Sequence, residues 1–247
     1  FEFPNENGEP YKSNGGKLVE SELGMIPEEW EIVTGTDMFN FYNGYSYKGK
    51  ELGPSRDAMV TIKNFNRDGS YRVEGLKEII ISDRVKPHHF VKVGDVIVAH
   101  TDLTQNADII GNPILIYSDA NYKNLIISMD TVKVSSKYDY VSNHFIYLLY
   151  KDKRFKNFAL SYVNGTTVLH LSKKAIKEYK FPLPSDTSIL EAFIQIIYPI
   201  FEKISNNILE NESILVLRNT LLPKLMSGEI RVPEAEEVVE SCLQKSN

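Results

Sequence analysis

The feature that most constrains the fold of this chain is an apolar repeat near its C-terminal end. Between Asp186 and Leu222, mostly apolar side chains recur at alternating spacings of four and three residues, a pattern typical of a coiled-coil helix. Such a helix is about 55 Å long, too long to bury its apolar seam against one small domain. A second helix, from the same protein or another chain, is therefore expected. The seam positions are Leu190, Ile194, Ile197, Phe201, Ile204, Ile208, Asn211, Leu215, Arg218 and Leu222.

The preceding part of the chain has a different pattern. Short runs rich in β-branched and aromatic residues alternate with turns up to about residue 122, and residues 66–69 (Asn-Arg-Asp-Gly) predict a tight turn. Residues 142–159 have apolar side chains at helical spacing. The sequence thus predicts an α+β chain in which a mixed, β-rich globular domain precedes a long coiled-coil-type helix. The predicted strand runs are residues 58–62, 71–73, 79–81, 96–99 and 114–117.

Composition divides the chain into four parts. Residues 1–22 are polar and glycine-rich, which predicts a connector or arm, and residues 23–184 form the globular domain. Residues 185–226 form the long helix. Pro199 removes one backbone donor and should kink this helix or mark a join between two helices. Residues 227–247 are expected to be a mobile acidic tail.

The charge is distributed unevenly along the sequence. The whole chain has a formal net charge of −5, yet residues 31–183 contain 21 Lys and Arg against 16 Asp and Glu, as well as all five histidines. The flanking segments are acidic. A basic central block suits a nucleic-acid partner, although such a bias is more often only a solvated face.

Several classes of protein are disfavoured by the composition. The single cysteine, Cys242, permits neither an intrachain disulfide nor a cysteine-based zinc site. No apolar stretch reaches the roughly 18 residues that a membrane helix needs, and residues 1–5 lack the features of a signal peptide. The expected location is the cytoplasm, without membrane attachment.

The sequence lacks the common motifs for catalysis and cofactor binding. The sequence has no glycine-rich nucleotide loop, no Asn-Pro-Pro-aromatic or Asp-Pro-Pro-aromatic tetrapeptide, and no Gly-x-Ser-x-Gly elbow. Residues 178–180 (Glu-Tyr-Lys) have the Glu-x-Lys spacing of many nucleases but lack an evident partner aspartate. His88 and His89 are adjacent, which does not suit one metal ion, and nearby residues do not complete a ligand set. No catalytic residue, metal or cofactor is predicted.

Four segments together carry a family pattern. They are residues 23–30 (LGMIPEEW), 94–105 (GDVIVAHTDLTQ), 165–172 (GTTVLHLS) and 221–230 (LLPKLMSGEI). In this order and spacing they resemble the DNA-specificity subunit of type I restriction-modification systems, over essentially residues 1–232. The resemblance implies a subunit without catalysis of its own, in which each target-recognition domain recognises one half of a bipartite double-stranded DNA sequence.

The resemblance also implies a set of partners. In such subunits two spacer helices pack antiparallel and set the distance between the two DNA halves, and methyltransferase (modification) subunits dock on them. A restriction subunit is a further candidate partner. This chain has one domain and one helix, and it resembles the C-terminal half of a longer subunit. The second spacer helix would then come from the same subunit.

Three alternatives stay open. The chain could be a natural half-subunit that forms a homodimer, although the absence of an initiator Met favours a fragment. It could instead be the recognition domain of a fused restriction-methylation enzyme whose catalytic part lies upstream of Phe1. A protein-assembly scaffold with no preference for any duplex is the third alternative.

Residue types point to three loops as the DNA-binding candidates. Arg, Lys, Asn and Gln present the donors and acceptors that base edges require, whereas phosphates accept any cation or short donor. The alternative is that these residues only shape turns, cap helices or form a solvated face. The candidates are Lys63, Asn64, Asn66 and Arg67 in the first loop, His100, Thr101, Asp102, Thr104, Gln105 and Asn106 in the second, and Thr166, Thr167, His170, Lys173 and Lys174 in the third.

Overall fold

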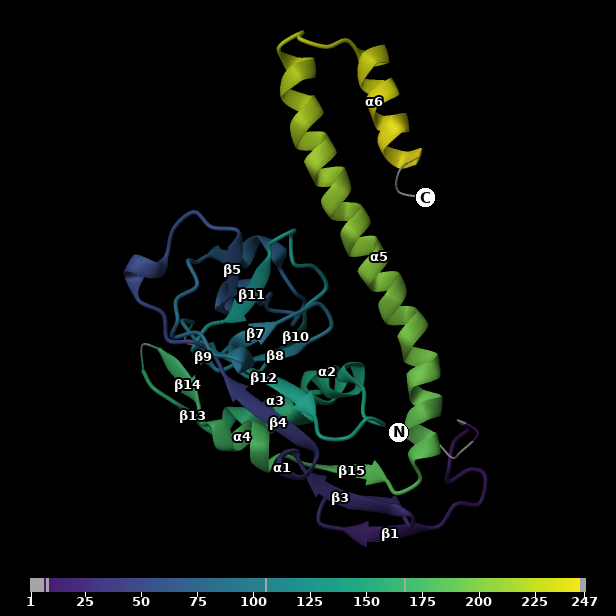
Figure 1. Ribbon diagram of the computed structural model, residues 1–247. Helices are drawn as coiled ribbons and strands as arrows, with labels where there is room; N and C mark the ends of the chain where they lie inside the picture. The colour runs from purple at the N-terminus through teal and green to yellow at the C-terminus, as the bar shows by residue number, and fades with distance from the viewer. Residues whose placement is uncertain (1–6, 8, 105, 167, 245–247) are drawn as a thin grey trace. The chain divides into compact units, whose positions relative to one another are not determined.

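The computed structural model describes residues 7, 9–104, 106–166 and 168–244, and it divides into two compact units, Phe1–Pro199 and Ile200–Asn247 (Figure 1). The helices are α1 (Gly35–Met38), α2 (Asn143–Lys151), α3 (Lys153–Leu160), α4 (Lys173–Glu178), α5 (Thr187–Met226) and α6 (Val232–Gln244). The strands are β1 (Leu18–Ser21), β2 (Gly24–Pro27), β3 (Trp30–Thr34), β4 (Phe39–Asn43), β5 (Asp57–Val60), β6 (Lys77–Glu78), β7 (Phe90–Val91), β8 (Val96–Ala99), β9 (Thr101–Asp102), β10 (Pro113–Leu115), β11 (Asn124–Ile127), β12 (Thr131–Ser136), β13 (Val163–Asn164), β14 (Leu169–Leu171) and β15 (Lys180–Pro184).

Two four-stranded sheets contain the main core of the first unit. One has the order β10-β8-β12-β4 and is antiparallel, and the other has the order β6-β5-β11-β7 with β5 and β11 parallel. Every residue of β8 is buried, which explains why this strand is a continuous apolar run and not an alternating one. The shared cluster draws side chains from both sheets: Ala58, Val60, Phe65, Val91, Ile97, Ala99, Ile114, Ile116, Leu125 and Ile127.

The entrance and exit of the globular domain lie side by side. Strand β15 pairs antiparallel with β3, in a register that joins Lys180 to Thr34 and Pro184 to Trp30. Helices α2 and α3 meet at Asp152, whose side chain accepts a hydrogen bond from the Arg154 N–H and so caps α3. The Tyr150 hydroxyl, fully buried, donates to the Ile176 carbonyl at 2.9 Å and fastens α2 to α4.

The α+β fold class predicted from the sequence is confirmed, and most of the predicted elements exist. The runs at 58–62, 96–99 and 114–117 correspond to β5, β8 and β10, and the stretch at 142–159 forms α2 and α3. The turn at residues 66–69 is present, with Gly69 at a φ of 75°. The prediction of strands at 71–73 and 79–81 is wrong. Tyr71 and Ile79 form only isolated bridges, and residues 73–75 form a 3₁₀ turn.

Regular secondary structure is present within the segment that was predicted to be a connector. Strand β1, within residues 1–22, pairs with β2 over four residues, and Ile26 of β2 is buried. The turn between them is possible because Gly24 adopts a φ of 97° and the Ser21 hydroxyl donates to the Gly24 carbonyl at 2.6 Å. Strands β1 and β2 therefore form a hairpin, which the polar composition of residues 1–22 does not predict.

The long helix is present as α5, and it runs through Pro199 without a break, so this proline does not separate two helices. In the first unit the ring of Phe193 lies 6.1 Å from that of Phe145 on α2. Burial along the predicted seam is uneven. Leu190 and Phe201 are buried, Ile194, Ile197 and Ile208 are half-buried, and Ile204, Leu215 and Leu222 are exposed.

The acidic C-terminal segment is helical and not an irregular tail. Residues Val232–Gln244 form α6, although a mobile tail is predicted from their charge. The helix is favoured because Pro233 lies in its first turn, where its missing N–H costs nothing, and because Glu234 accepts a hydrogen bond from the Arg231 N–H at 3.0 Å. Neither α5, α6 nor any other helix in the described part of the chain has the length and apolar character to cross a bilayer.

Candidate nucleic-acid interface

Two of the three predicted DNA-binding loops are neighbours in one small sheet. The sheet has the order β13-β14-β9, and its register places Leu169 opposite Asp102 and His170 opposite Thr101 (Figure 1). Strand β9 is followed by Leu103 and Thr104 of the second predicted loop. Strand β14 is followed by the two lysines that open α4. Segments about seventy residues apart in the sequence are thus adjacent in space.

The first loop reaches the same region through the turn at residues 66–69. The Arg67 guanidinium lies 3.3 Å from an Asp108 carboxylate oxygen, and Asn112 Nδ2 donates to the Arg67 carbonyl at 3.4 Å. Asp108 and Asn112 belong to the segment between β9 and β10. The first and second predicted loops therefore meet in residues 103, 104 and 106–112, which we call the central loop, and the third lies beside the strand that leads into it.

Solvent exposure divides the predicted residues into three groups. Gln105 and Thr167 lie outside the described residues. The buried members are Asn64, Thr101 and Asp102. The half-buried members are Asn66, His100 and Thr104. The exposed members are Lys63, Arg67, Asn106, Thr166, His170, Lys173 and Lys174. Five of the exposed side chains are basic or imidazole groups, which suit contact with phosphates.

Asn64 supports the fold, because both polar atoms of its buried amide bond to the backbone and neither faces solvent. It is fully buried; its Oδ1 accepts from the Thr61 N–H at 2.8 Å, and its Nδ2 donates to the Arg72 carbonyl at 2.9 Å. Asn66, half-buried at the start of the turn at residues 66–69, donates to the Ser70 hydroxyl at 2.9 Å. The turn-shaping alternative therefore describes Asn64.

Asp102 and Thr101 also face inward. Burial opposes ionisation of Asp102, but hydrogen bonds from Thr104, Ile109 and Ile110 prevail and hold its pKa below the usual value. The Thr101 hydroxyl donates to an Asp130 carboxylate oxygen at 3.1 Å. These two residues organise the base of the central loop, so direct contact with DNA is not available to them in this conformation.

His100 is a neutral group at the edge of the same surface. Burial, together with the nearby Lys173 and His170, lowers its pKa to about 4. Its Nε2 atom is buried and makes no hydrogen bond to any described residue. His100 therefore contributes no positive charge near pH 7.

Sequence reasoning missed Lys156, a residue of α3 that contacts the central loop. Lys156 of α3 is half-buried and directs its Nζ at the carbonyl oxygens of Ala107 and Ile110, at 2.8 and 2.6 Å. Nothing in the sequence around Lys156 distinguishes it from the exposed Lys153 of the same helix, because its acceptors lie more than forty residues away.

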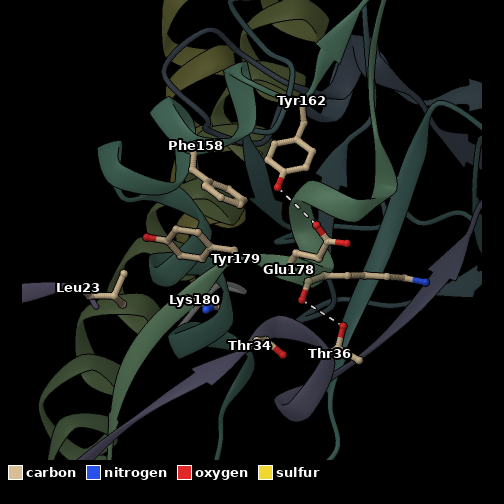
Figure 2. A pocket seen from close by; sticks show the side chains of 9 residues that line it. Leu23, Thr34, Thr36, Phe158, Tyr162, Glu178, Tyr179 and Lys180 are labelled. Carbon is tan, nitrogen blue, oxygen red and sulfur yellow. Dashed lines mark hydrogen bonds between the residues drawn. The ribbon is translucent and has the colours of Figure 1, made fainter. Parts of the chain in front are cut away.

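A pocket on another part of the globular domain contains the Glu-x-Lys sequence. Figure 2 shows Glu178, Tyr179 and Lys180 around this pocket, whose cavity volume is about 480 Å³. Glu178 accepts from the Tyr162 hydroxyl at 3.4 Å, and Lys180 pairs with Glu22 at 2.5 Å. Across the described residues, no three His, Cys, Asp or Glu side chains are grouped so that they could hold a metal ion. This pocket does not have the acidic cluster of a metal-dependent nuclease.

The neighbouring histidines at positions 88 and 89 have structural contacts. His89 Nδ1 accepts from the Lys86 N–H at 2.9 Å, and the two imidazole rings lie 4.3 Å apart at an interplanar angle of 66°. His89 is buried and closes a short 3₁₀ turn. These contacts give His89 a structural role in that turn.

Comparisons with known proteins agree with the resemblance seen in the sequence. A family model described as the type I restriction modification DNA specificity domain matches residues 27–219. The specificity subunit of the type I restriction enzyme MjaIX of Methanocaldococcus jannaschii is 40% identical over 72 residues, which are 29% of this chain and 16% of that protein.

The fold is shared with a solved structure. The S subunit of a type I restriction-modification system from M. genitalium aligns with a TM-score of 0.54 and 15% identity, over 80% of this chain and 46% of that one. The chain thus spans less than half the length of either relative. Because the family model covers most of the sequence and the fold agrees, the chain belongs to the type I restriction modification DNA specificity domain family.

Proposed function

We propose that this chain is a non-catalytic DNA-recognition module of a type I restriction-modification complex, and that its globular domain, residues 23–184, contacts one half of a bipartite duplex target. The observation that supports this is the proximity of three independently predicted loops, two of which meet in the central loop while the third lies beside the strand that leads into it. Pairing of β9 with β14 and contact of Arg67 with Asp108 create a surface that no single segment provides.

The exposed candidate residues of the globular domain are proposed to have two different tasks. Lys63, Lys173 and Lys174 carry point charges on exposed stems, which suit phosphate oxygens and provide affinity without sequence preference. Asn106 and Arg67 have the paired hydrogen-bonding groups that recognise adenine and guanine edges. The domain thus combines positioning contacts with base contacts.

The exposed apolar positions of α5 support the proposed spacer role of residues 185–226. Ile204, Leu215 and Leu222 repeat at the spacing of a coiled-coil seam, yet all three are exposed in this chain. We infer that a second helix covers them, from the other half of a longer subunit or from a second copy. Methyltransferase subunits would dock on the helical pair, with a restriction subunit as a further partner, in the cytoplasm.

The proposal is tested by DNA binding of single-lysine variants. Wild-type chain, Lys63→Ala, Lys173→Ala and the control Lys203→Ala are titrated with a labelled random-sequence duplex at several salt concentrations. Lys203 is an exposed lysine on α5, outside the globular domain, so the control removes the same charge. Loss of a phosphate contact should weaken binding and reduce the slope of log K against log salt by about one unit. Identical slopes for the test variants and the control would argue against this surface.

A further inference from the structure

The central loop is fixed by a buried carboxylate, that of Asp102. One oxygen of Asp102 accepts from the N–H and the hydroxyl of Thr104, both at 2.8 Å, and the other accepts from the N–H groups of Ile109 and Ile110 at 2.8 and 3.2 Å. The carboxylate thus ties the first residues of the loop to residues further along it. Asp102 is fully buried, so water does not compete for these donors.

The loop is also fixed by a half-buried ammonium group, that of Lys156. Besides the carbonyls of Ala107 and Ile110, Lys156 Nζ lies 3.3 Å from the Asp108 carbonyl and 3.0 Å from Asn112 Oδ1. Burial lowers the pKa of Lys156, while the carboxylates of Asp102 and Asp108 oppose this effect. N–H groups of the loop therefore donate to the Asp102 carboxylate, and its carbonyl oxygens accept from the Lys156 ammonium group.

This arrangement replaces the hydrogen bonds that regular structure would supply. The loop contains Ala107 at a φ of 55°, a left-handed conformation that residues with a Cβ adopt uncommonly and that the surroundings must stabilise, and Gly111 at a φ of 76°, which glycine adopts without strain. Removing either charge would leave buried donors or acceptors unpaired. The loop would then populate several conformations instead of one.

The fixed loop exposes a small set of side chains. Leu103 has 65% of its surface exposed, and Asn106 is exposed as well. An apolar side chain suits the thymine methyl group, and an Asn amide suits the paired groups on adenine. Asp108 and Asn112 connect the same loop to Arg67.

From these contacts we propose that Asp102 and Lys156 are positioning residues for sequence recognition, and that they hold the central loop so that Leu103 and Asn106 contact base edges in a DNA groove. This inference rests on the proposed function. A loop already held in its binding conformation loses less entropy when it meets a particular sequence. Affinity for arbitrary DNA comes from exposed cations elsewhere and should not depend on the loop.

The test compares the two kinds of binding in one set of variants. The full-length chain first enriches a pool from a random duplex library. Kd values for the enriched and starting pools are then measured for wild type, Asp102→Asn, Lys156→Met and the control Lys153→Met. Lys153 is an exposed lysine of the same helix, so the control loses an equal charge. Hydrogen exchange of the central loop is followed in parallel. If Lys156→Met fails to fold, Asn112→Ala replaces it, because it removes one acceptor of Lys156 and leaves the ammonium in place.

The expected result is a selective loss. In the positioning variants, or in Asn112→Ala as the replacement, the preference for the enriched pool falls by about tenfold or more, with affinity for the random pool kept within about twofold. Exchange of the Ile109 and Ile110 amides accelerates, and Lys153→Met behaves as wild type. An unchanged preference in the folded variants, or an equal loss for both pools, would overturn the inference alone. Failure of the wild-type chain to enrich any pool would overturn the proposed function as well.

Discussion

Burial separates polar side chains that look alike in the sequence. Asn64 and Asn66 lie two positions apart in the sequence, and both have an amide suited to adenine. The structure places Asn64 in the core with both amide atoms bonded, and it leaves Asn66 half-buried. Turn propensity and base recognition use the same residue types, so the sequence could not assign these two residues to different roles.

Asn64→Ala should destabilise the globular domain by about 1–3 kcal/mol, because it leaves the Thr61 N–H and the Arg72 carbonyl without their partner. Asn66→Ala, which loses one half-buried contact to Ser70, should cost less than about 1 kcal/mol. Urea unfolding of both variants measures the difference. Equal and small effects would show that Asn64 does not support the fold.

His100 should make stability depend on pH. Its pKa of about 4 in the folded chain lies below the ordinary value of 6.5, mainly because of burial. Between these values the unfolded chain binds the proton more readily, so stability present above pH 6.5 is lost as the pH falls towards 4. His100→Gln should reduce the loss between pH 7 and pH 5 by on the order of 1 kcal/mol, after allowance for solvent screening.

The measurement is urea unfolding of the wild type and of His100→Gln at the two pH values. The slope should shrink in His100→Gln and not vanish, because burial also lowers the pKa values of His89 and His144. A slope unaltered by His100→Gln would contradict the neutral, buried state of this imidazole.

At the scale of elements, the β13–β14 hairpin depends on one glycine. Gly165 has a φ of 115°, and a Cβ built there would lie 2.1 Å from the Val168 carbonyl oxygen. Gly165→Ala should therefore distort the hairpin and destabilise the domain by about 1–3 kcal/mol. Gly49→Ala is the matched control, because a Cβ at Gly49 meets no atom within 4 Å. Thermal unfolding compares the two. A Tm for Gly165→Ala as high as that of the control would refute the requirement for glycine.

The exposed seam of α5 predicts association of the chain when no other helix is supplied. Light scattering should report about twice 28.2 kDa at micromolar concentration. A Leu215→Asp, Leu222→Asp double variant should be monomeric, since it places charge on the seam, with no change in the unfolding of the globular domain. Val216→Asp is the control, because Val216 is exposed but lies outside the seam spacing. Dimer loss caused by Val216→Asp alone would contradict the predicted seam.

At the scale of the whole molecule, the sequence predicts what local periodicity determines. The spacing of apolar residues predicts a long helix, which is present as α5, and the apolar run at residues 96–99 predicts β8. The pairing of His170 with Thr101 and the contacts of Lys156 with the central loop depend on chain segments brought together only by folding. For that reason the three loops could be named from the sequence, but their proximity could not.

The measurement that tests the central claim most directly is selection of duplexes from a fully randomised library by the purified chain, followed by sequencing of the retained DNA. Recognition of a half-site predicts convergence on one short motif, which is lost when the exposed Asn106 and Arg67 are changed to Ala and kept in Lys203→Ala. Retained DNA with the same composition as the starting library would contradict the claim that this chain recognises a DNA sequence.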